Sequence, residues 1–391
     1  MSSSSYKYLY LNFLFLHLTI LVTGNLPQPY LPLDNIALDC GSSSESFVNH
    51  RNWTADISSK VALLDQDRGS KKSTANQAST HPVPYYTDPL GARGYAREFI
   101  LNVEDEMKNL SITFTPSPHV ADAYAFINGI EIVSMPTNLY YTAGDDKGLH
   151  DVGKDGAQYA LQKETALEMM YRLNVGGTEI IPLQDNMPFK KKLLWTACFV
   201  GDYLTDARPS AYQFNGTIQL QYNNHTRYAA PEDLYRTARS MGPDGTVNEK
   251  YNMTWEFPVH SSFTYLVRLH FCQIIPIILR KGDQAFEIYI ANKTAERYAD
   301  IIDWAGGNGV PIYKDYAVMM HARGIEELQN LSIALHPSPQ TFQFSDAMLN
   351  GVEIFKLSNS DNLSGPNPGS YQDSPTSATS SKPKLFFAVC R

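Results

Sequence analysis

The sequence has little charge, no long apolar run and no basic face. Charged residues make up 18% of the 391 residues, and the formal net charge is −8. The one basic run, Lys190-Lys191-Lys192, fits a solvated loop better than a phosphate-binding groove, so we expect no nucleic-acid partner. The most apolar stretch, from Tyr8 to Val22, is too short to span a bilayer.

Motifs for catalysis, metal binding and cofactor binding are also missing. No His-Glu-x-x-His, Gly-x-Ser-x-Gly or kinase signature occurs. The acidic connector at residues 138–156 lacks the spacing of a calcium loop, and the glycines at 306–309 lack that of a phosphate loop. His270 lies in an apolar strand pattern and is expected to be a hydrogen-bonded strand residue. We therefore expect no catalytic residue, no metal and no cofactor.

Cysteine is scarce, with only Cys40, Cys198, Cys272 and Cys390, and none forms a CxxC pair. Four cysteines allow three complete disulfide pairings, and the sequence leaves them open. Cys272 follows alternating apolar residues, which favours a buried free thiol.

Two blocks of the chain occur twice. NLSITFTPSP at 109–118 returns as NLSIALHPSP at 330–339, and FINGIEI at 126–132 returns as MLNGVEI at 348–354. Apolar residues alternate in both blocks, which predicts strands, and Asn-Gly predicts a tight hairpin turn. The repeat predicts an all-β fold of two tandem β-sandwich domains.

The spacing of the repeats predicts that the first copy is incomplete. LDCG at 38–41 and LNVG at 173–176 are 135 residues apart, whereas the NLSI blocks are 221 apart, so the first copy is 86 residues shorter. A weaker match, of 85–87 to 235–237, puts 71 of these missing residues between residues 87 and 109. In the corresponding interval the second copy holds its clearest period-two strands, at 262–271 and 284–290, so we expect the first copy to lack central strands.

Composition divides the chain into four parts. Residues 1–24 read as a signal peptide, with Lys7 before the apolar run and small residues before Asn25. The shortened first domain and its connector follow at 25–164, and the second domain at 165–357. Residues 358–391 are a Ser/Pro-rich stalk or tail.

Eight Asn-X-Ser/Thr sequons favour a secreted glycoprotein. They lie at Asn52, Asn109, Asn215, Asn224, Asn252, Asn292, Asn330 and Asn362. Asn109 and Asn330 begin equivalent strands, where strand chemistry without a glycan is the alternative.

Tyrosines at loop tips are candidate ligand-binding residues, because sugar rings stack their C–H faces on aromatic rings. The candidates are Tyr85, Tyr86, Tyr124, Tyr140, Tyr141, Tyr203, Tyr235 and Tyr313. The alternative is that these rings fill the sandwich cores and corners.

Seven motifs together carry a family resemblance. They are LDCGS at 38–42, RNWTAD at 51–56, FINGIEI at 126–132, YRLNVGG at 171–177, APEDLY at 230–235, LVRLHFC at 266–272 and WAGGNG at 304–309. The combination resembles the ectodomain of plant malectin-like receptor kinases, the FERONIA group, over nearly all of residues 35–357.

The resemblance implies two malectin-like β-sandwiches, then a juxtamembrane stretch, a membrane helix and a kinase. It implies secreted alkalinisation-factor peptides as ligands, a glycolipid-anchored co-receptor, a link to cell-wall pectin, and a location outside the cell or at the extracellular face of the plasma membrane. No sugar-binding motif of animal malectin can be matched residue by residue.

The chain departs from this pattern in three places. Central strands of the first domain are missing, residues 191–201 replace an acidic stretch of the family, and the sequence stops in the stalk. The expected function is a non-catalytic receptor ectodomain. The alternatives are a secreted lectin for cell-wall glycans and a truncated decoy that does not signal.

Overall fold

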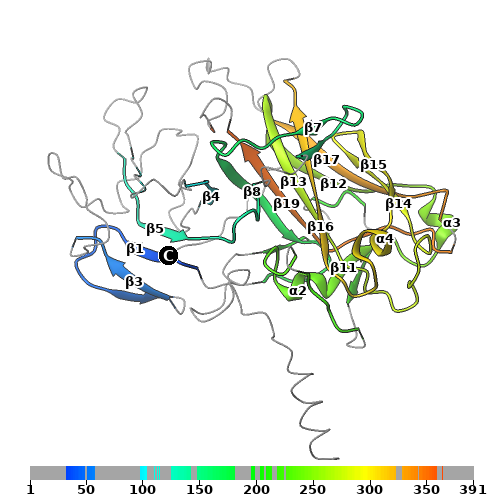
Figure 1. Ribbon diagram of the computed structural model, residues 1–391, viewed down its shortest axis with the longest axis horizontal. Helices are drawn as coiled ribbons and strands as arrows, with labels where there is room; N and C mark the ends of the chain where they lie inside the picture. The colour runs from blue at the N-terminus through cyan, green and yellow to red at the C-terminus, as the bar shows by residue number, and fades with distance from the viewer. Residues whose placement is uncertain are drawn as a thin grey trace, which may run out of the picture.

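The structure, a computed structural model, describes residues 32–48, 51–57, 97–103, 110, 112, 114, 125–141, 148–180, 195–198, 203–206, 208–213, 218–223, 226–322, 328–341, 343–358 and 363 (Figure 1). In these ranges the fold is all-β, as predicted, with three short helices. The strands are β1 (Asn35–Asp39), β2 (Ser46–Val48), β3 (Arg51–Ala55), β4 (Phe99–Ile100), β5 (Gly129–Val133), β6 (Leu149–Asp151), β7 (Gln158–Tyr159), β8 (Leu167–Asn174), β9 (Thr196–Ala197), β10 (Ser210–Gln213), β11 (Thr237–Ser240), β12 (Met253–His260), β13 (Phe263–Phe271), β14 (Phe286–Ile290), β15 (Lys293–Ala299), β16 (Ile312–Met320), β17 (Leu328–Pro337), β18 (Met348–Leu349) and β19 (Gly351–Leu357). The helices are α2 (Glu232–Tyr235), α3 (Gly245–Asn248) and α4 (Ile301–Ala305).

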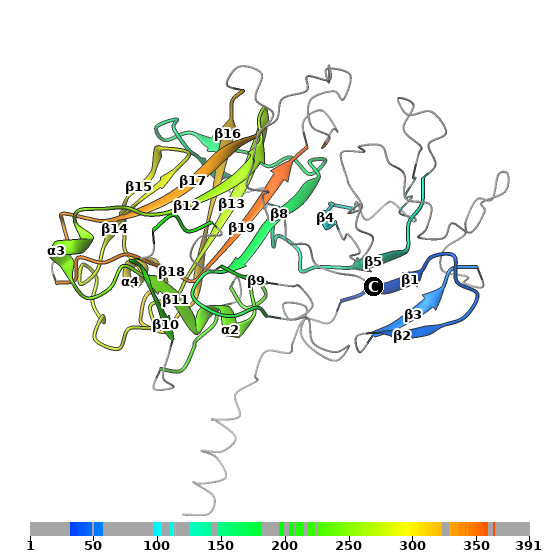
Figure 2. The same ribbon diagram turned by 180° about the vertical axis from the view of Figure 1, so that it is seen from behind.

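The second repeat is a β-sandwich (Figure 2). One layer is a large sheet in the order β4-β8-β19-β13-β16-β6-β7, with β9 beside β8, and the other is the sheet β12-β17-β14-β15. A small sheet, β10-β11-β18, adjoins them. The predicted strands at 262–271 and 284–290 are confirmed as β13 and β14.

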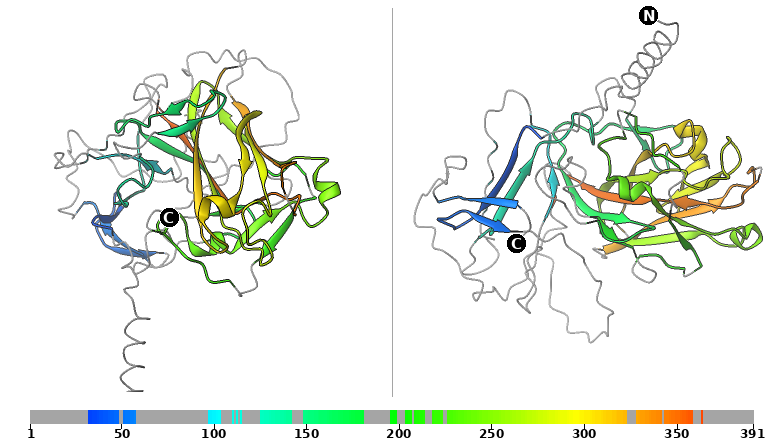
Figure 3. Two further views of the ribbon diagram at one scale, coloured as in Figure 1. Left: turned by 45° about the vertical axis from the view of Figure 1, so that its right-hand side comes forward. Right: turned by 90° about the horizontal axis from the view of Figure 1, so that it is seen from below.

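The first repeat forms a separate sheet in the order β2-β3-β1-β5, which lies to one side of the sandwich (Figure 3). Its pairing repeats that of the second copy. Asp39 lies opposite Gly129 as Asn174 lies opposite Gly351, and β3 runs parallel to β1 as β9 runs parallel to β8. The predicted correspondence of the two copies is therefore confirmed at the level of register.

The pairing also shows a third shared block. Thr54 lies opposite Leu38, and Thr196 lies opposite Leu173. WTA at 53–55 therefore corresponds to WTA at 195–197, and both tryptophans are buried. Sequence reasoning missed this repeat, although the three letters are identical.

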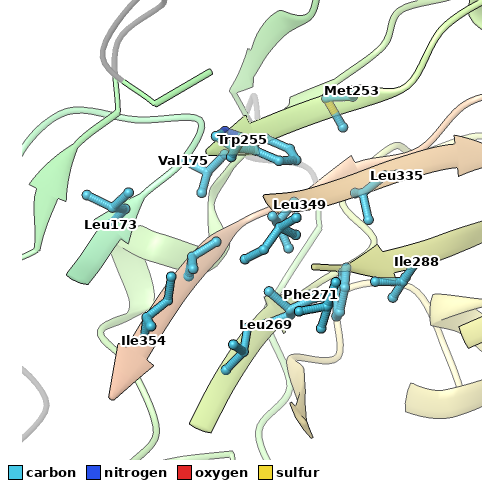
Figure 4. Packing of buried hydrophobic residues seen from close by; sticks show 14 of the residues in the cluster. Leu173, Val175, Met253, Trp255, Leu269, Phe271, Ile288, Leu335, Leu349 and Ile354 are labelled. Carbon is cyan, nitrogen blue, oxygen red and sulfur yellow. The ribbon is translucent and has the colours of Figure 1, made fainter. Parts of the chain in front are cut away.

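The main core lies between the two layers of the sandwich (Figure 4). Along β12, alternate residues from Met253 to Val259 point inward and are fully buried, and their neighbours point outward. Leu335 and Ile288 meet them from the same layer, and Leu269 comes from the large sheet. This period-two pattern is typical of a sheet with one face in the core.

The large sheet is covered on both faces. A second apolar cluster, with Leu266, Phe355 and Leu167, lies on the face away from the main core. Nearly every residue of β13 is therefore buried. This outer face of the large sheet carries the polar residues described below.

The Asn-Gly pairs do not form hairpin turns, which corrects the sequence prediction. β18 pairs with β11, whereas β19 pairs with β13 and β8, so the chain changes sheets at Asn350. The Asn350 side chain accepts a hydrogen bond from the Cys272 amide at 2.8 Å and donates to the Thr237 carbonyl at 2.8 Å. A Cβ on Gly351 would lie 2.7 Å from Leu234, so close packing, and not a turn, requires the glycine.

The expected division between residues 164 and 165 stays a prediction. β4, β6 and β7 precede it in sequence but belong to the large sheet of the second repeat. The signal peptide and all of the tail except residue 363 lie outside the described residues. None of the helices in the described part of the chain is long and apolar enough to cross a membrane.

Candidate functional site

A polar network is buried on the outer face of the large sheet. Arg172 on β8, His270 on β13 and Glu353 on β19 all point to this face because their neighbours in sequence, such as Leu173 and Leu269, point into the main core. All three polar side chains are almost completely inaccessible to solvent. We call these residues, with Glu98, Tyr140, Tyr235, Arg268, Tyr313 and Asp315, the junction network.

Glu353 is the centre of the network. Its Oε1 accepts hydrogen bonds from Arg172 Nε at 2.9 Å and from the Tyr140 hydroxyl at 3.2 Å. Its Oε2 lies 3.1 Å from His270 Nε2, and His270 Nδ1 lies 2.9 Å from the Tyr235 hydroxyl. This pattern assigns a neutral imidazole that donates from Nε2 and accepts at Nδ1.

Two arginines connect the network to its solvent-exposed edge. Arg172 donates a bidentate pair of hydrogen bonds to the Glu98 carboxylate, from Nη1 to Oε2 at 2.7 Å and from Nη2 to Oε1 at 2.6 Å. Arg268 binds Asp315 in the same way, with both distances 2.7 Å, and donates to the Leu139 carbonyl at 2.7 Å. Paired hydrogen bonds of this kind are among the stronger polar contacts in proteins.

Aromatic rings cover the charge of Arg268. Its guanidinium lies 3.9 Å from the centre of the Tyr313 ring and 4.6 Å from that of Tyr140. Its Nη1 has no hydrogen-bond partner among the described residues. The ring faces therefore take the place of a third polar partner.

Electrostatics keeps Glu353 charged and His270 neutral. Burial alone would raise the pKa of Glu353, but the hydrogen bond from His270 and the charge of Arg172 lower it to about 2. Burial lowers the pKa of His270 below its usual value, and Arg268 acts in the same direction while Glu353 opposes it. The prediction that His270 is a hydrogen-bonded strand residue is confirmed.

The network joins segments that are distant in sequence. Glu98, Leu139 and Tyr140 precede the second repeat, and the network attaches them to β8, β13 and β19. No group of three or more His, Cys, Asp or Glu side chains in the described ranges is placed to hold a metal ion. The network can therefore hold the segments around Glu98 and Tyr140 in a fixed position against β8, β13 and β19.

The structure brings three of the tyrosine candidates together and separates the others. Tyr140, Tyr235 and Tyr313 meet in the junction network, and Tyr140 and Tyr235 are buried. Tyr141 donates to the Thr165 carbonyl at 2.7 Å, and Tyr203 stacks on Phe257 with ring centres 5.1 Å apart.

The remaining candidates, Tyr85, Tyr86 and Tyr124, lie outside the described residues. Buried rings in a conformation like this one offer no free face to a sugar. Ligand binding by the eight tyrosines stays a prediction.

Four of the eight sequon asparagines are described, and all are exposed: Asn52, Asn252, Asn292 and Asn330. Asn292 lies in the turn between β14 and β15 with a positive φ of 60°, and Asn330 donates to Glu256 at 2.9 Å. Asn109, Asn215, Asn224 and Asn362 lie outside the described residues.

Sequence reasoning missed most of the junction network. The signal was present, because Arg172, Arg268 and Glu353 each lie between two apolar neighbours in strands that are mainly apolar. Such a charge in a buried strand requires a partner. The partner itself could not be read from the sequence, since Arg172 and Glu353 are 181 residues apart.

Comparison with known proteins agrees with this architecture. A malectin-like domain model matches residues 88–357. The chain is 35% identical to receptor-like protein kinase FERONIA of Arabidopsis thaliana over 87% of this chain and 44% of FERONIA. It is 40% identical to ANXUR1 of the same plant over 71% of this chain and 31% of ANXUR1. The chain thus spans less than half the length of these two relatives.

Solved structures match over most of the described fold. The plant receptor-like kinase FER superposes with a TM-score of 0.67 at 32% identity, covering 86% of this chain and 99% of that chain. The structure of the plant peptide RALF23 in complex with FER and LLG2 gives a TM-score of 0.65 at 32% identity, covering 87% and 99%. The fold and these matches define the class of the protein as a plant receptor ectodomain. The chain belongs to the malectin-like domain family, in the group of the FERONIA and ANXUR receptor-like kinases.

The alignment with FERONIA also supports the shortened first copy. It extends over 403 positions, whereas 87% of this chain is about 340 residues, so about 63 positions of the alignment have no counterpart here. That number is close to the 71 residues that the internal repeat places between residues 87 and 109.

Proposed function

We propose that this chain is an extracellular receptor module that binds secreted peptides of the alkalinisation-factor class together with a glycolipid-anchored co-receptor. The observation that carries the proposal is the match to FER in its complex with RALF23 and LLG2, which covers 87% of this chain. The second repeat supports it, because both layers of its sandwich are present and enclose a continuous apolar core.

Direct binding tests the proposal. The full secreted chain is titrated with RALF23, alone and with LLG2, and binding is followed by calorimetry. Saturable binding that tightens when LLG2 is present is the expected result. Absence of peptide binding in both arms would overturn the proposal.

A parallel titration with pectin fragments separates the receptor from the lectin alternative. Binding of the fragments in place of RALF23 would favour a lectin. The burial of Tyr140 and Tyr235 argues against that outcome in this conformation.

We also propose that the protein carries N-glycans. The exposure of Asn52, Asn252, Asn292 and Asn330 supports this, because a glycan needs an accessible side chain. Treatment of the secreted protein with an N-glycosidase is expected to increase its electrophoretic mobility by the mass of several glycans. An unchanged mobility would contradict this.

A further inference from the structure

The connection between β13 and β14, residues 272–285, presents two aliphatic side chains to solvent. Ile277 and Leu279 are 63% and 61% exposed. The side-chain amide of Asn308 donates to two carbonyls of this loop at 2.8 and 2.9 Å. The Asp283 carboxylate accepts hydrogen bonds from two of its amides at 3.1 and 2.9 Å. These contacts give the loop a defined backbone conformation.

Three buried polar side chains connect this loop to the interior. Gln273 Oε1 accepts a hydrogen bond from the Ile275 amide at 3.0 Å, and Gln273 Nε2 donates to Gln284 Oε1 at 2.7 Å. Gln284 Nε2 in turn donates to Asp346 Oδ2 at 3.1 Å. All three residues are buried. We call Gln273, Gln284 and Asp346 the amide relay.

The carboxylate at the inner end of the amide relay determines the direction of its hydrogen bonds. Because an ionised carboxylate can only accept, Gln284 must turn its NH2 group toward Asp346 and its oxygen toward Gln273. Gln273 must then donate to Gln284, which leaves its own oxygen for the Ile275 amide. The charge state of one interior side chain thus decides whether a loop amide has an acceptor.

Asp346 is held by neutral groups alone. Its Oδ1 accepts from the amides of Met241 and Ala347 at 2.9 and 2.8 Å, and its Oδ2 also accepts from the Ser240 hydroxyl at 2.7 Å. Within the described ranges, no cationic side chain pairs with it. Burying a carboxylate without a cation is costly, and a neutral side chain of the same shape would avoid that cost. The charge therefore indicates a role other than global stability.

We propose that Asp346 is a charge-dependent switch that acts through the amide relay to fix the 272–285 loop, and with it the positions of Ile277 and Leu279. When Asp346 is ionised, the relay has one direction and the Ile275 amide has its acceptor. When Asp346 is neutral, Oδ2 carries a hydroxyl group and accepts hydrogen bonds less well, so the relay is weakened.

The switch is expected to respond to pH. Burial raises the pKa of Asp346 to about 6, although its hydrogen bonds act in the opposite direction. The proton adds to Oδ2, because Oδ1 faces two backbone amides that cannot become acceptors, whereas the Ser240 hydroxyl beside Oδ2 can rotate. The loop is therefore fixed above about pH 6 and loosened below it.

The charged and titratable groups on the surrounding segments lie outside the amide relay. Tyr251, which follows α3, interacts with Asp346, but its pKa is raised by burial, so it stays neutral near pH 6. Glu249 accepts a hydrogen bond from a serine hydroxyl at 2.7 Å, and Asp283 accepts from loop amides. Arg239 on β11 donates to two backbone carbonyls.

Hydrogen–deuterium exchange of the full secreted chain tests the proposal, with mass spectrometry of peptides that cover residues 273–283. Asp346→Asn keeps the shape of the side chain but presents an NH2 group, which reverses the relay and leaves the Ile275 amide without an acceptor. Exchange in these peptides near neutral pH is expected to rise at least about 10-fold. The unfolding midpoint is expected not to fall, because the raised pKa of Asp346 shows that folding disfavours its ionised form.

The matched control is Glu249→Gln, because this carboxylate is exposed and bonds the serine next to Asp346 but not the relay. The control is expected to keep the wild-type exchange. A double variant, Asp346→Asn with Gln284→Glu, moves the charge one step along the relay. The new carboxylate at position 284 again accepts from Gln273, so this variant is expected to recover most of the wild-type protection.

A pH series on the wild type needs no substitution. Protection of residues 273–283, corrected for the intrinsic pH dependence of exchange, is expected to fall as the pH is lowered through about 6, and Asp346→Asn is expected to remove this change. Constant wild-type protection across this range, unchanged exchange in Asp346→Asn or no recovery in the double variant would overturn the proposal. A lowered midpoint with faster exchange throughout the second repeat would also overturn it, in favour of a packing role.

Discussion

Glu353 is the residue on which the folded second repeat depends most, because three buried groups donate to one carboxylate. Glu353→Gln keeps the shape of the side chain but removes the charge that balances Arg172. Breaking a buried ion pair by changing one partner costs about 3 kcal/mol or more of unfolding free energy. The expected loss is therefore about 3 kcal/mol, measured by denaturant unfolding of the secreted chain.

The matched control is Glu256→Gln on the outward side of β12, where the glutamate is exposed. An exposed substitution of this kind changes stability by no more than about 0.5 kcal/mol. Equal losses in the two variants would contradict the central role of Glu353.

The same carboxylate predicts a pH dependence. Its pKa is about 2 in the folded protein, below the usual value of 4.5, so the stability that it contributes is present above pH 4.5 and is lost as the pH falls toward 2. The advantage of the wild type over Glu353→Gln is expected to shrink by about 2 kcal/mol between pH 5 and pH 3.

Comparing the two proteins cancels the opposing effect of Asp346, whose pKa burial raises to about 6 in both. Unfolding free energies at a series of pH values give the measurement. A difference that stays constant across this range would show that Glu353 has an ordinary pKa.

At the scale of elements, the sequence predicted strands and their repetition better than turns. The repeated blocks correspond in the structure because Leu38 and Leu173 have equivalent partners on β5 and β19. The Asn350-Gly351 turn was predicted wrongly because Asn-Gly is a local signal, whereas the change of sheet at this point depends on β11 and β13, which are distant in sequence.

Gly176, just after β8, lies so close to β11 that a substitution there is expected to destabilise the fold. A Cβ here would lie 2.1 Å from the backbone of Ala238 on β11. Gly176→Ala must therefore separate the two segments, and we expect a loss of about 3 kcal/mol in unfolding free energy.

Gly307→Ala is the control, because its Cβ would meet no atom closer than 3.8 Å and its φ is not in the left-handed region. Thermal unfolding of both variants tests the prediction. A Gly176→Ala protein as stable as the control would mean that β8 and β11 approach less closely than described.

For the whole molecule, the internal repeat indicated both the all-β fold and the incomplete first copy. Leu110, Ile112 and Phe114 are 41–47% exposed whereas their counterparts in the second copy are fully buried, as an incomplete first copy predicts. The junction network could not be foreseen at this scale, since Glu98 and Arg172 meet across 74 residues only when the first part of the chain lies against the large sheet.

The two repeats are therefore expected to differ in resistance to proteolysis. The second repeat has a continuous core between two sheets, so cleavage inside it requires unfolding that costs about 5–15 kcal/mol. Residues 251–292, which include β12, β13 and β14, should be spared. Cleavage is expected first between residues 58 and 94 of the first repeat, because that repeat lacks its central strands; those residues lie outside the described ranges. Limited proteolysis with mass spectrometry of the fragments measures the order of cleavage. Equal protection of both repeats would mean that the strand count inferred from the internal repeat is wrong.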